Sequence, residues 1–432
     1  MKLAVVGGGW AGLAAAVRAA QRGHEVTLLE LAGQLGGRAR SVRTAAGEFD
    51  NGQHILIGAY AATLGLMRTV GVDVERAFLR TPLRIVHADG SGLAMPPGPA
   101  IPAFARAVLS YRGWSWRERL ALLGAAGAWA VRRFQCPADW TVARLTQSLP
   151  ESVRRSFIEP LCVAALNTPA SQASAGVFLR VLHDALFSGP GASDLLVPRA
   201  SLHALLPKPA GRWLSAHGVR VETSRRVLAV GPDQSVDSGW LVDDEAFDGV
   251  ILACTSHEAA RLAAHVNPAW AETALALRHE PIITAYLQRE GGGLREAMVA
   301  LEDDDRRPAQ FAFDHDKLSG RSGLVAAVAS GASLWTSRGL DATGEAMKAQ
   351  MDSLPGMGHA DAAGPRASWR VLQVLAEKRA TFLCVPRLRR PPMHIAPGLL
   401  AAGDYVDGPY PATLEGAVRC GLQAADALAG DR

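Results

Sequence analysis

The chain has 432 residues, of which 49% are hydrophobic and 20% charged, with 44 glycines and 25 prolines. This length suggests two or three domains, and the composition excludes disordered, collagen-like and low-complexity classes. The net charge is only +4 and the basic residues are spread along the chain, so we expect no nucleic-acid partner. Five cysteines without metal-ligand spacing predict free thiols in a reducing, cytoplasmic compartment and no metal site. The longest apolar run, residues 120–131, is too short for a transmembrane helix.

The first thirty residues have the pattern of a βαβ unit. Residues 2–6 are a short apolar strand, residues 10–21 carry the helix formers Ala, Leu and Arg, and residues 26–29 indicate a second strand. Gly23 stands where a helix would end. A positive residue before an apolar stretch is also typical of a signal peptide. A cleaved peptide, however, has no reason to carry the glycine spacing described next or to continue into a second strand.

A glycine motif joins the first predicted strand to the helix. Gly7, Gly9 and Gly12 have the G-x-G-x-x-G spacing, which takes its weight from its position between strand and helix rather than from the spacing alone. The first glycine permits a tight turn, the second lets the backbone approach a pyrophosphate, and the third lets helix and strand pack closely. The helix N-terminus then offers unpaired N–H groups to phosphate. The alternative is a glycine-rich turn in an ordinary α/β unit.

Glu30 follows the second predicted strand. A carboxylate at this point accepts hydrogen bonds from a ribose diol and repels a 2′-phosphate, so the expected dinucleotide is of the FAD or NAD type and not NADP. The predicted cofactor contacts of this unit are Gly7, Gly9, Trp10, Ala11, Gly12 and Glu30.

The pattern then changes along the chain. Glycines and prolines cluster in residues 88–102, which predicts a linker, and residues from about 104 to 186 are mostly helical in pattern. A small sheet is expected from short β segments at residues 219–222, 226–230, 240–243 and 249–253.

The last third of the chain predicts a further sheet and a closing helix. Residues 285–290 and 323–330 indicate strands, with an exposed acidic turn at residues 302–305 between them. A buried strand at residues 399–402 leads through a loop into a helix from residue 412 to about residue 428.

Two further segments narrow the class of dinucleotide. A second glycine turn ending in Arg38 follows Glu30, and Gly403-Asp404 precedes the closing helix. With these segments the chain resembles the flavin-dependent amine oxidase and phytoene desaturase superfamily. The resemblance implies FAD as cofactor and an α/β fold, in which a discontinuous Rossmann-like FAD-binding domain of the GR2 type carries an inserted α+β substrate domain. The implied FAD-binding parts are residues 1–87, 196–256 and 391–432, and the implied substrate parts are residues 88–195, mainly helical, and 257–390.

The resemblance also implies roles for single residues. Gly37 and Arg38 would lie beside the pyrophosphate, although a solvated basic edge is the alternative for Arg38. Val227 would hold adenine through its backbone, whereas Cys254 is expected to be a core thiol because no base is adjacent in sequence. The other implied cofactor contacts are Gly52 and Gln53 at the reactive face of the flavin, Gly403 and Asp404 at the ribityl and pyrophosphate, and Pro411, Leu414 and Glu415 at the start of the closing helix, whose positive end suits the N1 edge of reduced flavin.

The helical insert resembles a narrower group, the hydroxysqualene dehydroxylases, through residues 161–169, 173–184 and 192–199. This resemblance implies reductive removal of the hydroxyl of hydroxysqualene to give squalene for hopanoids. The proton donor we expect is His54, with Tyr405 or Tyr410 as the alternative, because these residues lie in the two loops expected nearest the flavin. A turn with a structural histidine is the other interpretation of His54.

Residues 112–133 combine Trp, Leu and Arg as an interfacial helix does, so a peripheral site on the inner face of the cell membrane is expected. A buried substrate-domain helix is the alternative.

Three other functions stay open: a carotenoid desaturase that transfers electrons in the opposite direction, an amine oxidase, and a flavin-free prenyl-binding protein. The sequence leaves open the electron donor, the oligomeric state, the direction of redox flux and the residues that set substrate length.

Overall fold

The computed structural model describes residues 1–235, 239–290, 292–354 and 368–430. The predicted βαβ unit is confirmed as β1 (Lys2–Val6), α1 (Trp10–Gln21) and β2 (Glu25–Leu29). Helix α1 is rich in alanine and most of it is buried, which lets it lie close against its neighbours. It ends before Gly23, whose φ of +78° reverses the chain at no steric cost.

Six strands form the central sheet in the order β10-β2-β1-β14-β21-β20. The four strands not yet given are β10 (Arg220–Glu222), β14 (Gly249–Leu252), β21 (Leu399–Ala401) and β20 (His394–Ala396). The first five are parallel, and β20 pairs antiparallel at the edge. Because distant stretches of sequence contribute these strands, the predicted discontinuous Rossmann-like fold is confirmed.

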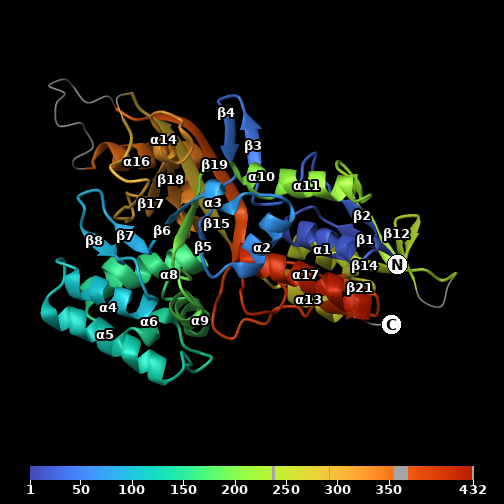
Figure 1. Cartoon of the computed structure of the whole chain (residues 1–432), viewed down its shortest axis with the longest axis horizontal. Coiled ribbons are helices and arrows are strands. Elements are labelled where there is room, and N and C mark those ends of the chain that lie inside the picture. Colours follow the sequence, from blue (N-terminus) through green and yellow to red (C-terminus); the bar gives the residue numbers. More distant parts are fainter. Residues whose placement is uncertain (236–238, 291, 355–367, 431–432) are drawn as a thin grey trace.

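Helix α17 (Leu414–Gly430) packs against α1, so the first and last helices of the chain lie side by side (Figure 1). The contact is close because a Cβ at Gly421 would stand 2.1 Å from the carbonyl oxygen of Ala11. Arg18 Nε also donates to Asp426 at 2.8 Å. Three helices of the same region are α11 (Pro207–Ala216), α12 (Ser256–Ala263) and α13 (Pro268–Leu275).

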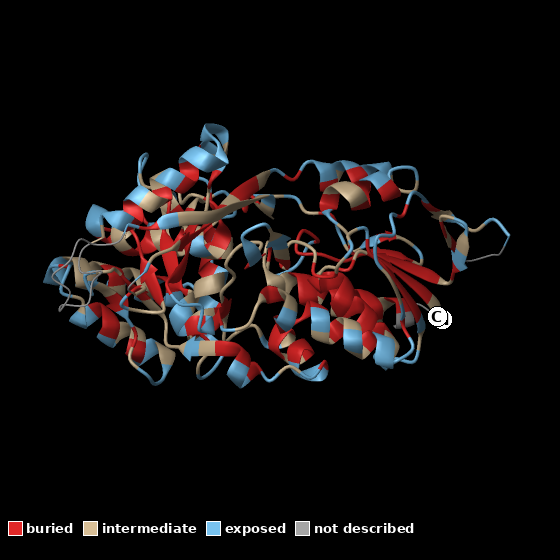
Figure 2. Cartoon of the chain, turned by 90° about the horizontal axis from the view of Figure 1, so that it is seen from above, coloured by how far each residue is buried: buried red, intermediate tan, exposed pale blue. Residues whose placement is uncertain are grey.

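A second sheet is antiparallel, with strand order β16-β17-β18-β15-β19. Its strands are β15 (His279–Gln288), β16 (Met298–Ala300), β17 (Phe311–Asp314), β18 (Leu324–Ala329) and β19 (Arg370–Phe382). Two of them match the predicted strands, and the acidic turn between them is exposed as expected. Helices α14 (His315–Ser319), α15 (Ser333–Arg338) and α16 (Leu340–Asp352) accompany this sheet. Figure 2 shows buried residues concentrated around both sheets.

The predicted helical stretch is confirmed. Its elements are α4 (Ala100–Ser110), α5 (Trp116–Val131), α6 (Val142–Leu145), α7 (Glu151–Val153), the π-helix η1 (Arg154–Ile158), α8 (Glu159–Leu166) and α9 (Ala175–Phe187). Ser115 and Glu118 form a capping box that starts α5, and Thr141 and Ser174 cap α6 and α9. The predicted linker at residues 88–102 is wrong in part, because β8 (Gly92–Ala94) pairs with β7 (Arg84–Val86) and α4 starts inside it.

The expected small sheet is also wrong in part. Residues 220–222 and 249–252 join the central sheet, while β11 (Val230–Pro232), β12 (Trp240–Val242) and β13 (Glu245–Phe247) form a separate antiparallel sheet. Residues 226–229 are not a strand; the backbone N–H groups of Leu228 and Ala229 donate instead to the Asp243 carboxylate.

The remaining elements are β3 (Ser41–Thr44), β4 (Gly47–Asp50), β5 (Leu56–Ile57), α2 (Ala61–Thr69), α3 (Val74–Ala77), β6 (Phe78–Thr81), β9 (Leu195–Pro198) and α10 (Leu202–Leu205). The domain boundaries stay a prediction.

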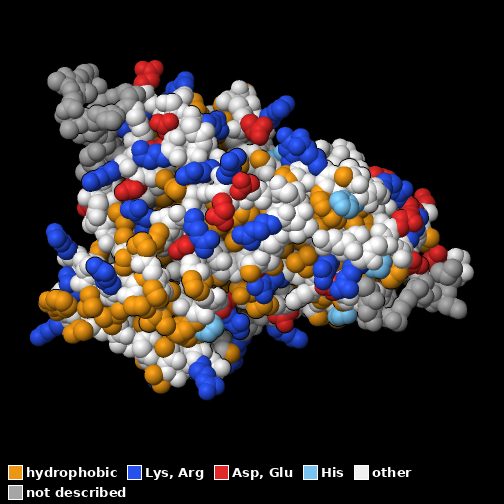
Figure 3. All heavy atoms as spheres, viewed as in Figure 1, with side chains coloured by type: hydrophobic (Ala, Val, Ile, Leu, Met, Phe, Trp, Pro, Cys, Tyr) orange, Lys and Arg blue, Asp and Glu red, His pale blue; other side chains and the backbone are white. Residues whose placement is uncertain are grey.

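Helices α4 and α5 carry an exposed apolar patch with basic neighbours (Figure 3). Trp116 is 64% exposed, whereas Trp114 is 4% exposed and donates its indole N–H to Ser156. Trp129 is buried as well, so two of the three tryptophans expected at an interface belong to the core. The exposed apolar residues here are Ile101, Leu109, Trp116, Leu120 and Val131, and the exposed basic ones are Arg106, Arg112, Arg117, Arg132 and Arg133. Among the described residues, no helix has the length and apolar character needed to cross a bilayer.

Candidate cofactor and substrate site

A cavity of about 800 Å³ lies at the carboxyl ends of four parallel strands. It is lined by the residues that directly follow or end them: Val6 and Gly7 after β1, Leu29 and Glu30 after β2, Ala253 and Cys254 after β14, and Gly403 and Asp404 after β21. Strands β2 and β14 pair with β1 on its two opposite sides, so the strand order reverses at β1. The cavity lies at the carboxyl edge of this part of the sheet. Open α/β sheets bind ligands at such a point.

The first glycine loop forms the floor of this cavity. Gly7 has a φ of +113°, and a Cβ there would stand 2.6 Å from the carbonyl oxygen of Ala253. A Cβ at Gly12 would stand 1.8 Å from the carbonyl oxygen of Gly7. Gly9 caps α1 without a side chain, so the first N–H groups of the helix, at Trp10 and Ala11, are left for a ligand. This loop suits an anionic group such as a pyrophosphate.

The second glycine turn touches the first. Gly36 N–H donates to the carbonyl oxygen of Gly8 at 2.8 Å. A Cβ at Gly37 would stand 3.0 Å from the Cα of Gly9, and Gly37 has a φ of +60°. The two glycine-rich segments therefore bring backbone without side chains to the same part of the cavity. This leaves room there for a bulky anionic group.

Glu30 is buried and lines the cavity. One carboxylate oxygen accepts from Gly8 N–H at 2.5 Å and the other from Ala32 N–H at 2.7 Å. A carboxylate has about four acceptor positions, so lone pairs remain for the hydroxyls of a ribose. The carboxylate is thus held in place by the two loops before any ligand arrives.

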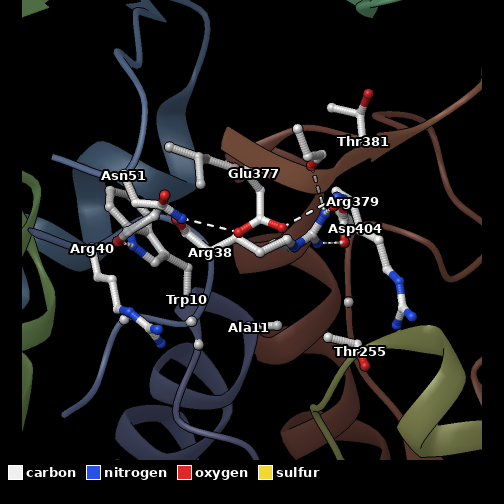
Figure 4. A pocket seen from close by; sticks show the side chains of 18 of the residues that line it. Trp10, Ala11, Arg38, Arg40, Asn51, Thr255, Glu377, Arg379, Thr381 and Asp404 are labelled. Carbon is white, nitrogen blue, oxygen red and sulfur yellow. Dashed lines mark hydrogen bonds and ion pairs between the residues drawn. The ribbon is translucent and has the colours of Figure 1, made fainter. Parts of the chain in front are cut away.

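Arg38 joins the opening and closing segments of the chain. Its guanidinium pairs with the carboxylate of Asp404, 366 positions further along, and donates to the carbonyl oxygen of Ala380 at 2.7 Å (Figure 4). This pairing does not match the alternative interpretation, in which Arg38 belongs to a solvated basic edge. The structure confirms that the two distant segments line one cavity, and Ala412, Thr413 and Leu414 at the start of α17 line it too.

The loop after β4 supplies a second group of lining residues: Asn51, Gly52, Gln53 and His54. Asn51 Nδ2 donates to Glu377 Oε2 at 3.0 Å, which joins this loop to β19 (Figure 4). His54 Nδ1 lies 3.3 Å from the Gly52 carbonyl oxygen. Burial lowers the pKa of His54, and the Arg38 charge lowers it further, so the imidazole is neutral at pH 7.

Five predicted residues do not line the cavity: Gly12, Tyr405, Tyr410, Pro411 and Glu415. Gly12 instead makes room for the packing of loop against helix. Glu415 is fully buried, and its carboxylate accepts from the N–H groups of Ala62 and Thr63 at 3.1 and 2.9 Å. Arg419 also donates to this carboxylate at 2.6 Å. With these partners, Glu415 holds the start of α2 rather than facing a ligand.

The two tyrosines also lie outside the cavity lining, and among the described residues the Tyr405 hydroxyl has no hydrogen-bond partner. Tyr405 is buried, and burial raises the pKa of its phenol well above the usual value. For Tyr410, burial and then the Asp184 carboxylate raise the pKa, and the Arg419 guanidinium lies 4.6 Å from the ring centroid. Of the three proposed proton donors, only His54 lines the cavity.

The side of the cavity predicted to hold adenine contains Val227, whose carbonyl oxygen already accepts from Arg261 Nη2 at 2.7 Å. Arg225 and Arg226 line the cavity beside it. Burial raises the pKa of Cys254 to about 12, so this thiol is a poor nucleophile at neutral pH.

The opposite end of the cavity is apolar. Helix α8 contributes Val163, Ala164, Ala165 and Leu166, and the second sheet contributes Ile282 and Leu375. Sequence reasoning missed Tyr60, Asn167, Thr284 and Glu377, which also line the cavity. No local motif surrounds these residues. The one available signal was the period of two in residues 282–286, which puts Ile282, Thr284 and Tyr286 on one face of a strand.

A parallel sheet with two glycine turns and a carboxylate at its carboxyl edge defines a dinucleotide-binding α/β protein. The chain belongs to the family described as flavin containing amine oxidoreductase, which matches residues 10–429. The glycine loops and Glu30 fit the pyrophosphate and ribose of FAD, and the protein is an FAD-dependent oxidoreductase.

The chain is also similar to two curated proteins named hydroxysqualene dehydroxylase. The one from Sinorhizobium fredii is 26% identical and the one from Rhodopseudomonas palustris 27% identical, each over 98% of this chain and 97% of the relative. The predicted resemblance to this group is confirmed. Among solved structures, an oxidoreductase from Methanosarcina mazei matches 99% of this chain and 100% of its own with a TM-score of 0.73 at 16% identity, which shows the shared fold.

Proposed function

We propose that this oxidoreductase removes the hydroxyl of hydroxysqualene, giving squalene and water in squalene and hopanoid biosynthesis. The full-length similarity to proteins named hydroxysqualene dehydroxylase supports the proposal. The observation that carries it is the apolar wall of α8, Ile282 and Leu375, because it belongs to the same cavity as the glycine loops. A hydrocarbon chain against this wall has its reacting carbon within the cavity that receives the flavin.

The reaction replaces a C–OH bond by a C–H bond, so it consumes one hydride and one proton and releases water. Reduced FAD supplies the hydride. The protein must protonate the leaving hydroxyl, orient the carbon and keep water out. We assign the proton to Nε2 of the His54 imidazolium, the form whose fraction grows as pH falls. A carbonyl oxygen only accepts, so the Nδ1 hydrogen stays on Gly52 and the Nε2 hydrogen is the one that reaches the leaving hydroxyl in the cavity. The apolar wall excludes water from the allylic cation that forms as the hydroxyl departs.

The test is anaerobic incubation of dithionite-reduced holoprotein with hydroxysqualene, following flavin reoxidation and squalene together. We expect one squalene for each flavin reoxidised. Oxidised holoprotein with phytoene serves as the comparison, because a carotenoid desaturase would reduce its flavin with that substrate. Flavin reduction by phytoene without squalene formation from hydroxysqualene would overturn the proposal.

We further propose that the α4/α5 patch binds anionic lipid. A C30 hydrocarbon has a gross transfer free energy from water above roughly 20 kcal/mol, at about 0.8 kcal/mol per methylene, so it reaches the protein from a bilayer. The mixture of exposed Trp116, Leu120 and Val131 with exposed arginines favours a bilayer surface over a neutral apolar partner. The expected position is the inner face of the cell membrane.

A further inference from the structure

The hydroxyl of Thr284 has no hydrogen-bond partner in the described part of the chain, although Thr284 is only 1% exposed. A buried hydroxyl without a partner costs free energy, and native proteins satisfy most such groups. Thr284 also lines the cavity. Thr284 therefore brings an unpartnered hydroxyl to the wall of a cavity that a ligand enters.

The two cross-strand partners of Thr284 are apolar. Thr284 lies in β15, directly opposite Leu375 of β19 and Val328 of β18. On its own strand, the next residue on the same face toward α8 is Ile282, and both Ile282 and Leu375 line the cavity. Glu377, the cross-strand partner of Ile282, and Ser330 also line the cavity, but Glu377 accepts from Asn51, whereas the Thr284 hydroxyl has no partner among the described residues.

The strand that carries Thr284 is fixed to the loop that carries His54. Tyr286, on the same face of β15, donates its hydroxyl to the carbonyl oxygen of Asp50 at 2.9 Å, and its ring lies 4.6 Å from that of Phe49. Asn51 makes a second connection through Glu377. These contacts hold Thr284 and the His54 loop on adjoining walls of one cavity.

We propose that Thr284 is the hydrogen-bonding anchor for the substrate hydroxyl, an inference that rests on the proposed function. Thr284 Oγ1 accepts the hydrogen of the alcohol, which leaves a lone pair of the alcohol oxygen free to take a proton from His54. A hydroxyl suits this task because it offers acceptor lone pairs without a charge that the apolar wall would have to bury. The anchor thereby selects the one oxygenated carbon of a long hydrocarbon.

The test compares Thr284→Val and Thr284→Ser with the wild type. Oxidised holoprotein is titrated with hydroxysqualene and, separately, with squalene in detergent micelles, and binding is followed by the change in the flavin spectrum. A neutral hydrogen bond corresponds to roughly 5- to 10-fold in affinity. We expect Thr284→Val to lose about that factor for hydroxysqualene and nothing for squalene, and Thr284→Ser to retain the wild-type preference.

A stability measurement separates this role from a structural one. Thr284→Val removes a hydroxyl that bonds to nothing in the fold, so its Tm should equal or exceed that of the wild type. Thr343→Val is the matched control, because Thr343 is equally buried but donates to the carbonyl oxygens of Gly339 and Trp335, at 2.7 and 3.0 Å. It should lower the Tm and leave lipid preference unchanged.

The outcomes also separate this inference from the proposed function. If the wild type forms squalene and Thr284→Val still prefers hydroxysqualene by the wild-type factor, the anchor is overturned while the reaction stands. If the wild type neither forms squalene nor prefers hydroxysqualene, both are overturned. A changed flavin spectrum in Thr284→Val before any lipid is added would assign the hydroxyl to the cofactor and overturn the anchor.

Discussion

The two ends of the cavity are built in different ways. At the cofactor end, the walls are mainly backbone: Gly37 approaches Gly9, and Gly7 approaches Ala253, because these glycines carry no Cβ. At the substrate end, the walls are side chains from α8, β15 and β19, which meet only through tertiary pairing. The first end tolerates almost no change of residue, whereas the second can change its shape one side chain at a time. The difference separates what the fold requires from what the substrate requires.

The largest effect is expected at the cofactor end. Gly12→Ala adds a Cβ that would stand 1.8 Å from the Gly7 carbonyl oxygen, so the first loop must move and FAD binding should be lost. The visible flavin absorbance per chain measures this, and far-UV circular dichroism reports whether the chain is folded. Gly65→Ala in α2 is the control, because its added Cβ would meet no heavy atom within 4 Å apart from its own neighbouring residues and helix backbone. A Gly12→Ala protein with a full complement of FAD would contradict the backbone account of this end.

His54 lines the same cavity, and its replacement should affect turnover alone. His54→Ala should keep FAD and slow turnover at least about a hundredfold. Because burial lowers the folded pKa of His54 below 6.5, the protonated fraction grows as pH falls from 7 toward that pKa, and wild-type turnover should rise over the same range. His54→Ala should lose this rise. Equal rates and equal pH profiles for the two proteins would remove His54 from the mechanism.

The smallest effect is expected outside the cavity. Trp116→Ala with Leu120→Ala should weaken flotation with vesicles containing anionic lipid, by roughly 10-fold, because two exposed apolar side chains leave the bilayer interface. Leu334→Ala, an exposed leucine on α15, is the matched control. Turnover in detergent should stay unchanged in all variants. Undiminished flotation of the double variant would reject this surface.

The same contrast explains how far the sequence could be interpreted. The glycine turns and Glu30 are local and constrain the backbone, so they were visible as a motif of adjacent residues. Strand β19 was missed because most of its residues are half-buried, with no alternation of apolar and polar positions.

Side-chain neighbours separated by long stretches of sequence were equally invisible. Glu377 accepts from Asn51 across 326 positions. Thr284 is recognised as a cavity residue only once Leu375 and α8 are seen beside it. Trp114 and Trp116 are two residues apart, yet the helix cap at Ser115 turns one into the core and the other outward. Glu415 was predicted to face the cofactor because it begins a helix, and its true partners in α2 lie more than 350 positions away.

The most direct test of the central claim is a crystal structure of the holoprotein with squalene bound. The account predicts FAD with its pyrophosphate on the two glycine turns, and the hydrocarbon in the same cavity against α8 and Leu375, with its central carbons between Thr284 and His54. Squalene bound in a separate cavity, or FAD filling the apolar end and leaving no room for lipid, would contradict it.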